Sequence, residues 1–532
     1  EAQERYVLSV SQQDLPGFES ICARERCPVA VVGHVTSKRD LVLGDSKLGE
    51  APVSVPLQLV LGKPPRMERV AERHDVEVEA FMPGAADIES SLRKVLRHPA
   101  VGSKSFLITI GDRSVGGLVA RDQMVGPWQV PVADAAVTLA GFSGFSGEAM
   151  AMGERAPLAI VDGPASGRMA VAEAITNIAS APVARLSDIR LSANWMAAAG
   201  EQGQDATLFD TVEAVGMELC PELGIAIPVG KDSLSLKTVW NDPEDGEKRM
   251  VAPVSLVVSA FAPVSDARKA LTPQLRLNQG ASRLLLLDLG AGKDRLGGSV
   301  LAQVNGAFGN EVPDLDDAKQ LKGFFRAIQR MNRDGLLLAY HDRSDGGLAS
   351  VVCEMGFASR CGIRLDFDMP PERLVPRLFA EEPGAVLQVK VDDLKNVRAI
   401  CRDEGIDSIL HDIGRPANEE TFRISVNAEQ VLEADIRSLH LDWGETSYAM
   451  QRLRDNPECA DEERAGLENW SRPVLKPQLT FDADDNPAAP LLLNKSRPAV
   501  AILREQGVNG QTEMAAAFHL AGFRAVDVHM SD

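Results

Sequence analysis

The amino-acid sequence predicts a chain of several domains in the α/β and α+β classes. Its 532 residues are more than one hydrophobic core normally serves. Apolar runs bounded by glycines, such as residues 282–290, are typical of buried strands, and helical patterns follow several of them. From residue 497 on, the pattern reads strand, turn, helix, strand, which is the opening βαβ unit of a doubly wound domain.

The first 98 residues predict the end of one domain and then a linker. Within residues 1–45, strand patterns at 6–10 and 29–35 flank a helical pattern at 17–25. Residues 46–98 are mixed in character, and the Pro-Pro pair in the polar stretch 61–69 predicts a linker there.

Two large blocks follow, residues 99–265 and 280–436. In the first block, strands are expected at 105–109 and 134–139, and helices at 166–179 and 207–220. Residues 437–495 are polar and Pro-rich and predict a linker with one helix, whereas 496–532 hold the terminal βαβ unit. Because the sequence lacks an initial Met and both ends lie at strand patterns, we expect it to be part of a longer polypeptide.

Charge and cysteine content argue against several classes of function. The sequence has 76 acidic and 56 basic residues, a net charge of −20, which disfavours a nucleic acid or an anionic membrane as the main partner. The 7 cysteines are scattered without a C-x-x-C pair, so neither a zinc site nor a disulfide framework is indicated. A reducing, cytoplasmic compartment fits best. No apolar run is long enough to span a bilayer, and the start does not resemble a signal peptide.

The stretch HDRSDGGLAS, residues 341–350, carries the most informative pattern for chemistry. An apolar run at 335–340 precedes it and a helical pattern at 348–355 follows, so it predicts a strand, a polar turn and a helix. Gly346 and Gly347 would let the backbone approach a ligand, and the first helical turn offers free N–H groups to an anion.

The acids of this turn leave two interpretations open. Asp342 and Asp345 would repel a bare phosphate, but the same carboxylates favour a phosphate that carries Mg²⁺. Taken alone, the pattern fits an ordinary helix N-cap at Ser344 or Asp345 better.

Three further side chains could complete an oxygen-ligand site with Asp342. Glu173 and Asn177 are four residues apart on a predicted apolar helix and so share one face, where they need partners or a ligand. Asp134 stands at the edge of a predicted strand after a Pro-containing turn. Such an all-oxygen set favours Mg²⁺ over zinc. An interface-facing polar pair fits Glu173 and Asn177 equally well, and an acid such as Asp134 is more often a turn residue.

Other polar stretches give weaker signals. Lys104 could reach a phosphate, although a solvated lysine is the commoner case. The glycine-rich stretch 140–157 is not a Walker loop and fits either a loop over a ligand or a connector. Residues 296–303 resemble a glycine turn that opens a helix. The pattern D-R-S-x-G-G-L occurs at 112–118 and at 342–348, but the flanking sequences do not match, so a repeat is not demonstrated.

Several stretches spread along nearly the whole chain occur in the order that they have in a known family. They are QERYVLSV, GDRSVGGLVARDQMVGPWQVPVADAAVT, GEAMAMGERAP, EAITNIA, LSANWMAAAG, PVGKDSLSLKT, LGGSVLAQ, HDRSDGGL and ILREQGVNG. Together they closely resemble the family of large-form phosphoribosylformylglycinamidine synthases, the PurL family of purine biosynthesis. This resemblance is far more specific than any single motif.

The resemblance implies a synthase region of two similar PurM-like halves, each with an α/β ATP-binding subdomain and an α+β subdomain, followed by a doubly wound class I glutaminase domain. The implied domains are the end of the first C-terminal subdomain (1–45), a linker (46–98), the second N-terminal subdomain with nucleotide and Mg²⁺ (99–265), the second C-terminal subdomain (280–436), a linker (437–495) and the start of the glutamine amidotransferase domain (496–532).

The resemblance also implies two kinds of site residue. The expected Mg²⁺ ligands are Asp134, Glu173, Asn177 and Asp342. The expected contacts with ATP or ADP are Ala133, Ser344 and Lys104. The nucleophilic Cys of the glutaminase, with its His and Glu, would lie beyond Asp532, so no cysteine of this chain is assigned a catalytic role.

The implied activity is that of an ATP-dependent amidoligase with glutamine as the nitrogen donor. ATP would phosphorylate the amide oxygen of formylglycinamide ribonucleotide, and ammonia from glutamine would attack the amide carbon to give the amidine, ADP and phosphate. The expected partners are these small molecules and the rest of the same polypeptide. Two roles stay open for the site: it performs this chemistry, or it is a non-catalytic scaffold holding a structural Mg-nucleotide, toward which the resemblance leans. The terminal strand–turn–helix unit speaks against a small-molecule kinase of the same superfamily.

Overall fold

The structure is a computed structural model that describes residues 5–49, 51–63, 70–74, 76–84, 87–111, 113–114, 116–471, 474, 477–493, 496–505 and 508–530. The chain divides into two units, Glu1–Val70 and Ala71–Asp532. Within the described residues, no helix combines the length and the hydrophobicity needed to cross a bilayer.

The first unit is small and largely exposed. Its elements are α1 (Leu15–Arg24), β1 (Asp40–Leu43), β2 (Val53–Pro56) and α2 (Leu57–Leu61), with β1 and β2 paired antiparallel. The helix expected at 17–25 is confirmed as α1, but the strands expected at 6–10 and 29–35 are wrong. These segments have no neighbouring strand in the described part of the unit, and a strand needs a partner for its backbone hydrogen bonds. Of the linker expected at 61–69, residues 64–69 lie outside the described residues.

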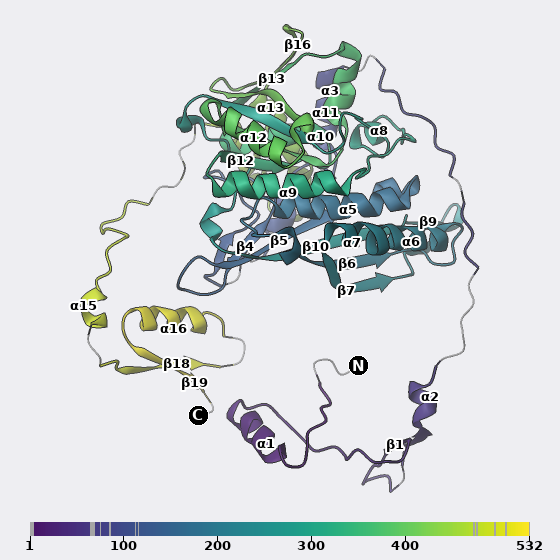
Figure 1. The fold of residues 1–532 in the computed structure, drawn as a ribbon, viewed down its shortest axis with the longest axis vertical. Helices are drawn as coiled ribbons and strands as arrows, with labels where there is room; N and C mark the ends of the chain where they lie inside the picture. Colours follow the sequence, from purple (N-terminus) through teal and green to yellow (C-terminus); the bar gives the residue numbers. More distant parts are fainter. Residues whose placement is uncertain are drawn as a thin grey trace. The chain divides into compact units, whose positions relative to one another are not determined.

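A six-stranded mixed sheet forms the first layer of the second unit (Figure 1). In spatial order its strands are β3 (Val119–Arg121), β4 (Ala136–Leu139), β5 (Gly147–Glu154), β10 (Ser255–Val264), β6 (Arg190–Met196) and β7 (Ala226–Ser233). The helices of this part are α4 (Ser105–Ile108), α5 (Gly163–Ile178), α6 (Gln204–Glu213) and α7 (Cys220–Leu223), with a π-helical turn at Ala214–Leu219. A hairpin of β8 (Lys237–Asp242) and β9 (Gly246–Val251) extends from it.

Helix α5 packs directly on strands β5 and β10. Gly153 permits this close approach, because a Cβ at that position would run into the carbonyl oxygen of Ala170. The helices expected at 166–179 and 207–220 and the strand expected at 134–139 are confirmed. The strand expected at 105–109 is wrong, since Ser105–Ile108 is the short helix α4. A short apolar run does not distinguish a strand from a helical turn by its period.

A seven-stranded mixed sheet forms the second layer. In spatial order its strands are β12 (Leu337–Asp342), β14 (Gly384–Lys390), β11 (Ser282–Asp288), β15 (Leu410–Ala417), β13 (Gly362–Phe367), β16 (Thr421–Val426) and β17 (Glu429–Asp435). Its helices are α8 (Val300–Val304), α9 (Ala318–Arg333), α10 (Gly347–Ser359), α11 (Leu374–Phe379) and α12 (Leu394–Asp403). The buried strand expected at 282–290 is confirmed as β11.

Both stretches expected to be linkers contain helices that pack into this body. These helices are α3 (Ile88–Arg97), α13 (Ile436–Arg454) and α14 (Pro457–Glu468), whereas the short helix α15 (Ala489–Leu492) of the second stretch has no buried residue. Arg93 and Arg97 of α3 form ion pairs of 2.6 and 2.5 Å with Asp442 of α13. Leu92 and Leu96 of α3 are buried in the core of the second layer. The many polar residues on the exposed faces of these helices made the stretches resemble linkers in the sequence.

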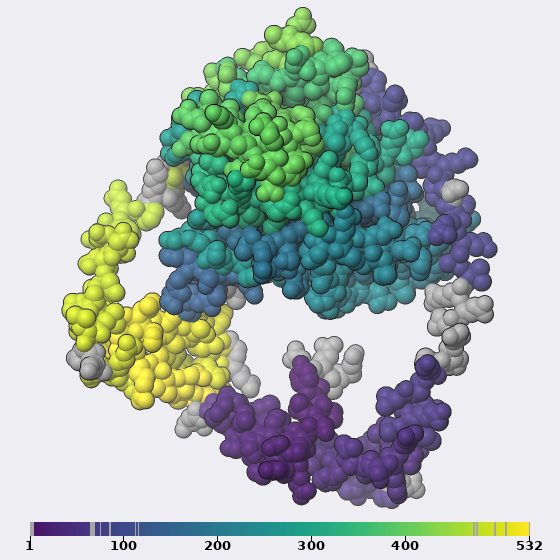
Figure 2. Space-filling view, in the orientation of Figure 1, coloured from purple at the N-terminus to yellow at the C-terminus, as the bar shows by residue number. Residues whose placement is uncertain are grey.

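Helices α5 and α9 lie side by side between the two sheets (Figure 1). One buried apolar cluster contains residues from both layers, such as Ile175 of α5, Phe324 of α9 and Tyr340 of β12. Figure 2 shows the blue residues of the first layer and the green residues of the second in contact along one boundary. The hydroxyl of Tyr340 donates to the backbone oxygen of Thr176 at 2.6 Å, which fixes the end of β12 beside α5.

The last described segment is a separate βαβ unit. Strands β18 (Ala499–Arg504) and β19 (Arg524–His529) pair in parallel, and α16 (Gln511–Leu520) connects them. This confirms the strand, helix and strand expected after residue 497. A parallel pair joined by a helix is the building block of doubly wound sheets.

Candidate functional site

The turn after β12 has the conformation that the glycines of HDRSDGG predict. Strand β12 ends at Asp342 and helix α10 begins at Gly347. Gly346 and Gly347 have φ values of 79° and 68°, in the left-handed region that favours glycine. A Cβ on Gly347 would also lie 2.8 Å from the carbonyl oxygen of Ala380. The predicted strand–turn–helix is confirmed, and the turn brings its backbone close to its neighbours.

Two carboxylates meet at the start of this turn. The backbone N–H of Asp342 donates to Oδ1 of Asp134 at 3.0 Å. Oδ2 of each aspartate is buried without a hydrogen-bond partner among the described residues. Burial, reinforced by the charges of Asp134 and Glu173, raises the pKa of Asp342 well above its usual value. Two buried carboxylate oxygens that lack hydrogen-bond partners are suitable ligands for a hard cation such as Mg²⁺.

Glu173 of α5 reaches the same turn from the first layer. Its Oε2 accepts from the backbone N–H of Glu154 at 2.6 Å, and its Oε1 accepts from the hydroxyl of Ser344. Burial raises the pKa of Glu173 to about 7, although the charge of Arg155 opposes the shift. The structure therefore brings together Asp134, Glu173, Asp342 and Ser344.

Asn177 and Lys104 have their side chains engaged elsewhere. The amide of Asn177, one helical turn after Glu173, donates to the carbonyl oxygen of Met152 at 3.0 Å. The ammonium group of Lys104 donates to the backbone oxygens of Ala100 (3.1 Å) and Gly102 (2.5 Å). Burial lowers the pKa of Lys104, and the charges of two nearby acids, Glu354 and Asp345 of the turn, oppose that shift.

Ala133 lies immediately before Asp134. Its backbone N–H donates to the oxygen of Gln123 at 3.3 Å. Any contact with a ligand at this position would therefore involve other atoms of the residue.

His341 is a part of the site that the oxygen-ligand reasoning missed. Its Nδ1 lies 2.7 Å from Oδ1 of Asp134, and its Nε2 lies 2.9 Å from Glu354. Burial opposes a charge on His341, but Asp134 and Glu354 outweigh it and raise its pKa well above the usual value. The imidazolium then donates to both carboxylates and fixes the position of Asp134. One potential metal-ligand atom from each of Asp134, His341 and Asp342 lies within 4.8 Å of the other two.

Arg155 is a second residue that the sequence reasoning missed. It follows β5, is 4% exposed, and forms ion pairs with Asp345 of the turn and with Glu381. Burial opposes its charge, yet the two acids raise its pKa. A lone arginine after a strand carries no signal in one sequence, because its partners come from distant parts of the chain.

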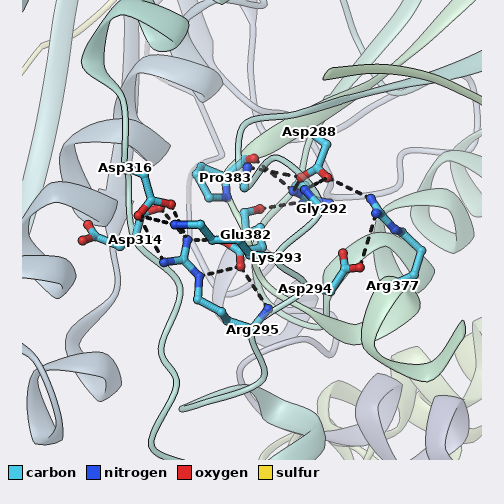
Figure 3. Close-up of polar contacts among 12 residues, drawn as sticks. Asp288, Gly292, Lys293, Asp294, Arg295, Asp314, Asp316, Arg377, Glu382 and Pro383 are labelled. Atoms are coloured by element: carbon cyan, nitrogen blue, oxygen red, sulfur yellow. Dashed lines mark hydrogen bonds and ion pairs between the residues drawn. The ribbon is translucent and has the colours of Figure 1, made fainter. Parts of the chain in front are cut away.

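A buried ion network flanks the turn on the side of loop 288–295 (Figure 3). Arg343 of the turn contacts Asp288 at 2.5 Å, and Arg377 contacts the same acid at 2.8 Å and Asp294 at 3.3 Å. Although burial opposes it, these arginines hold the pKa of Asp288 well below its usual range. The guanidinium of Arg343 is thus paired with an acid of the protein itself.

The weaker signals of the sequence have other roles in the structure. The helix start at 296–303 is α8, and the N–H of Val300 donates to the carboxylate of Glu381 at 2.9 Å, so the chain supplies its own anion there. The glycine-rich stretch 140–157 forms the β4–β5 turn and strand β5. The repeated pattern at 112–118 falls partly outside the described residues, which lack 112 and 115.

Comparison with known families agrees with this architecture. Residues 103–263 match the FGAR-AT PurM_N-like domain, and residues 283–427 match the AIR synthase related protein, C-terminal domain. Residues 497–532 match the CobB/CobQ-like glutamine amidotransferase domain. Fold and domain order thus define PurM-like N- and C-terminal domains followed by a glutamine amidotransferase-type domain. The chain belongs to the PurL-type phosphoribosylformylglycinamidine synthase family.

Solved structures show a more distant likeness. T. maritima PurL complexed with FGAR is 13% identical, with 67% of this chain and 53% of that chain covered and a TM-score of 0.49. PurLQS from Thermotoga maritima is 14% identical, with 72% and 53% covered and a TM-score of 0.48. E. coli HypE, a hydrogenase maturation protein, is 16% identical, with 53% and 84% covered and a TM-score of 0.38. The chain spans about half the length of the PurL structures, and these scores add no argument beyond the family matches.

Proposed function

We propose that this chain is part of an ATP- and glutamine-dependent enzyme that converts formylglycinamide ribonucleotide to formylglycinamidine ribonucleotide. Membership of the PurL-type family supports the proposal. Residues 99–265 and 280–436 would be the two subdomains of the second synthase half, and 496–532 the start of the glutaminase domain. Residues 1–45 would be the end of the first half.

We further propose that the turn after β12 is one side of a Mg²⁺–nucleotide site. Asp134, Glu173 and Asp342 would hold the metal, and Asn177 would join them through its Oδ1, because its bond to Met152 uses only the amide N–H. The observation that carries this proposal is the pair of buried carboxylate oxygens without partners, Oδ2 of Asp134 and of Asp342. The donor set contains carboxylate and amide oxygens, which suit Mg²⁺.

The nucleotide would lie against Ser344, Ala133 and Lys104. The Ser344 hydroxyl, now bound to Glu173, would turn to the nucleotide, and Lys104 would exchange two backbone carbonyls for phosphate oxygens. His341 would keep Asp134 oriented through its hydrogen bond at Nδ1. The ion, when bound, supplies charge neutralisation for the phosphate groups.

A second candidate role is that of a structural nucleotide. The packing of the turn favours it: Arg343 is buried against Asp288, Ser344 is bonded to Glu173, and Asp345 is paired with Arg155. A ligand enclosed by such contacts would exchange slowly and would stabilise the two layers together.

Two substitutions in the full-length protein separate these roles: Asp342→Ala and Glu173→Ala. The measurements are ammonia-dependent amidine formation and the nucleotide retained per chain after purification. Asp366→Ala is a matched control, because this aspartate is exposed on strand β13 of the same sheet as β12. If amidine formation stops while nucleotide stays bound, the site performs the chemistry. If nucleotide and thermal stability are lost together while the remaining folded enzyme turns over normally, the nucleotide is structural. If neither nucleotide nor activity changes, the proposed site is wrong.

A further inference from the structure

A buried carboxylate outside the proposed ligand set holds the backbone of the turn. Glu381 is 1% exposed and lies just before β14. Its Oε1 accepts from the backbone N–H of Gly346 at 2.7 Å and from that of Val300 at 2.9 Å. Its Oε2 is 2.5 Å from Arg155. One side chain therefore joins the turn, the start of α8 and an arginine of the other layer.

Arg155 contacts the turn from the side of the six-stranded sheet. Its guanidinium bridges Glu381 and Asp345, and its own carbonyl oxygen accepts from the hydroxyl of Ser166 on α5 at 2.7 Å. The preceding residue, Glu154, donates its N–H to Glu173. Two consecutive residues thus fix Glu173 through the backbone and the turn through a side chain.

This arrangement sets the spacing between the two sides of the proposed site. Asp134 and Glu173 belong to the first layer, whereas Asp342 and Ser344 belong to the turn of the second. Buried ion pairs are weak contributors to stability, because desolvation offsets their attraction. Their geometric effect is larger here, because Glu381 and Arg155 bond directly to two successive residues of the turn, Asp345 and Gly346.

We propose that Glu381 and Arg155 are positioning residues that hold the 342–347 turn in register with Glu173 for binding of Mg²⁺ and nucleotide. This inference rests on the proposed function. Neither residue touches the ligand; both act through the backbone and side chains of the turn. Groups that orient metal-binding carboxylates in this way typically change affinity by about 10- to 100-fold when they are removed.

The neighbouring glutamate offers a matched control. Glu382 is equally buried and accepts from the backbone N–H and the guanidinium of one arginine, Arg295, at 3.0 and 2.8 Å (Figure 3). Among the described residues, its side chain forms hydrogen bonds and an ion pair with Arg295 alone, and the turn reaches it only through the charge of Arg343. Glu381→Gln and Glu382→Gln therefore create the same kind of defect, an amide nitrogen facing a guanidinium, in two adjacent places; Arg155 is 4% exposed and Arg295 is 13% exposed.

The experiment measures equilibrium binding of radiolabelled ADP with Mg²⁺ to the full-length protein after its nucleotide has been stripped with EDTA. ADP whose binding is abolished by Asp342→Ala is the ADP held at this site. We expect Glu381→Gln to weaken this binding at least tenfold, by about the amount known for such orienting groups. Glu382→Gln should change the ADP affinity by less than about threefold, which is the context-dependent scatter of side-chain effects. It should lower the denaturation midpoint by about as much as Glu381→Gln does.

Arg155 and Asp345 test the same proposal with milder changes. Arg155→Lys keeps the charge but loses one of the two bridges, so its affinity for ADP should lie between those of wild type and Arg155→Met. Asp345 is 41% exposed, and Asp345→Asn therefore serves if Glu381→Gln does not fold. Its ADP affinity should also fall.

Three outcomes would overturn the positioning role. They are equal ADP affinities of Glu381→Gln and Glu382→Gln, wild-type affinity in Asp345→Asn, and no difference between the two Arg155 variants. If Asp342→Ala removes no bound ADP, the proposed nucleotide site itself is wrong, which is a different result.

Discussion

His440 makes the stability of the second layer sensitive to acid. It lies on α13, is 5% exposed, and stacks on Phe357 with ring centroids 4.6 Å apart. Its Nδ1 has no hydrogen-bond partner among the described residues. Burial, with a smaller effect of the Arg360 charge, lowers its pKa from 6.5 to about 3.

The sign and size of the effect follow from linkage. The folded protein keeps His440 neutral, whereas the unfolded chain binds a proton below pH 6.5. The unfolded state is therefore stabilised relative to the folded state as the pH falls. The contribution of His440 is present above pH 6.5 and is lost as the pH falls toward 3. Between pH 7 and pH 5, proton binding by His440 in the unfolded chain lowers the free energy of unfolding by about 2 kcal/mol, which corresponds to about 1.4 pK units.

The assay is guanidinium denaturation at pH 7 and pH 5, followed by tryptophan fluorescence. Trp443 and Trp470 have rings 5.8 and 6.3 Å from His440 and report on this region. Wild type should lose about 2 kcal/mol more than His440→Gln between the two pH values, because glutamine does not titrate. Equal losses in the two proteins would refute the reasoning. A larger loss in the variant would do so as well.

Three other predictions concern single residue types. Asp342→Asn should raise the melting temperature of the metal-free protein, because a buried charge near other acids is removed. With Mg²⁺ and ADP at 100 times the Kd, wild type should gain about 2.7 kcal/mol by calorimetry and the variant nothing; an equal gain would contradict the site. Gly153→Ala should cost about 1–3 kcal/mol in urea denaturation, since its Cβ meets the Ala170 carbonyl, and an unchanged midpoint would mean that α5 can shift freely. Of the 7 free thiols only Cys27 and Cys459 are exposed, so a thiol reagent should titrate two rapidly in the native state and all of them in denaturant; fast reaction of a third would contradict the burial.

Local pattern was sufficient for much of the fold. The strand at 335–340, its Gly-Gly turn and the helix after it follow from period, glycine chemistry and apolar runs within a few residues of one another. The run at 105–109 failed because nothing local separates a short strand from a helical turn. Helix α3 was not predicted, and the helix expected at 437–495 was placed in a linker, because half of each of α3 and α13 faces solvent. Their pairing through Asp442 joins positions some 345 residues apart.

The site divides in the same way. Asp134, Glu173, Asp342 and Ser344 were predicted as site residues from residue type and resemblance, and the structure brings them together. Arg155 could not be found, because its partners Asp345 and Glu381 are 190 and 226 positions away. His341 stood beside the motif, yet its role depends on Asp134, which is 207 positions away. Long-range pairing of buried charges leaves no trace in a single sequence.

The pairing of α3 with α13 means that the chain enters and leaves the two-layer body at adjacent points. Residues 98–435 are therefore a folded segment whose two ends are held together by one helix pair, α3 and α13. Such a segment can be excised, reconnected in a different order or inserted into another host, provided that the pair is kept. Duplication of a unit with this property needs no redesign of its interior, because the new copy begins and ends at the same place.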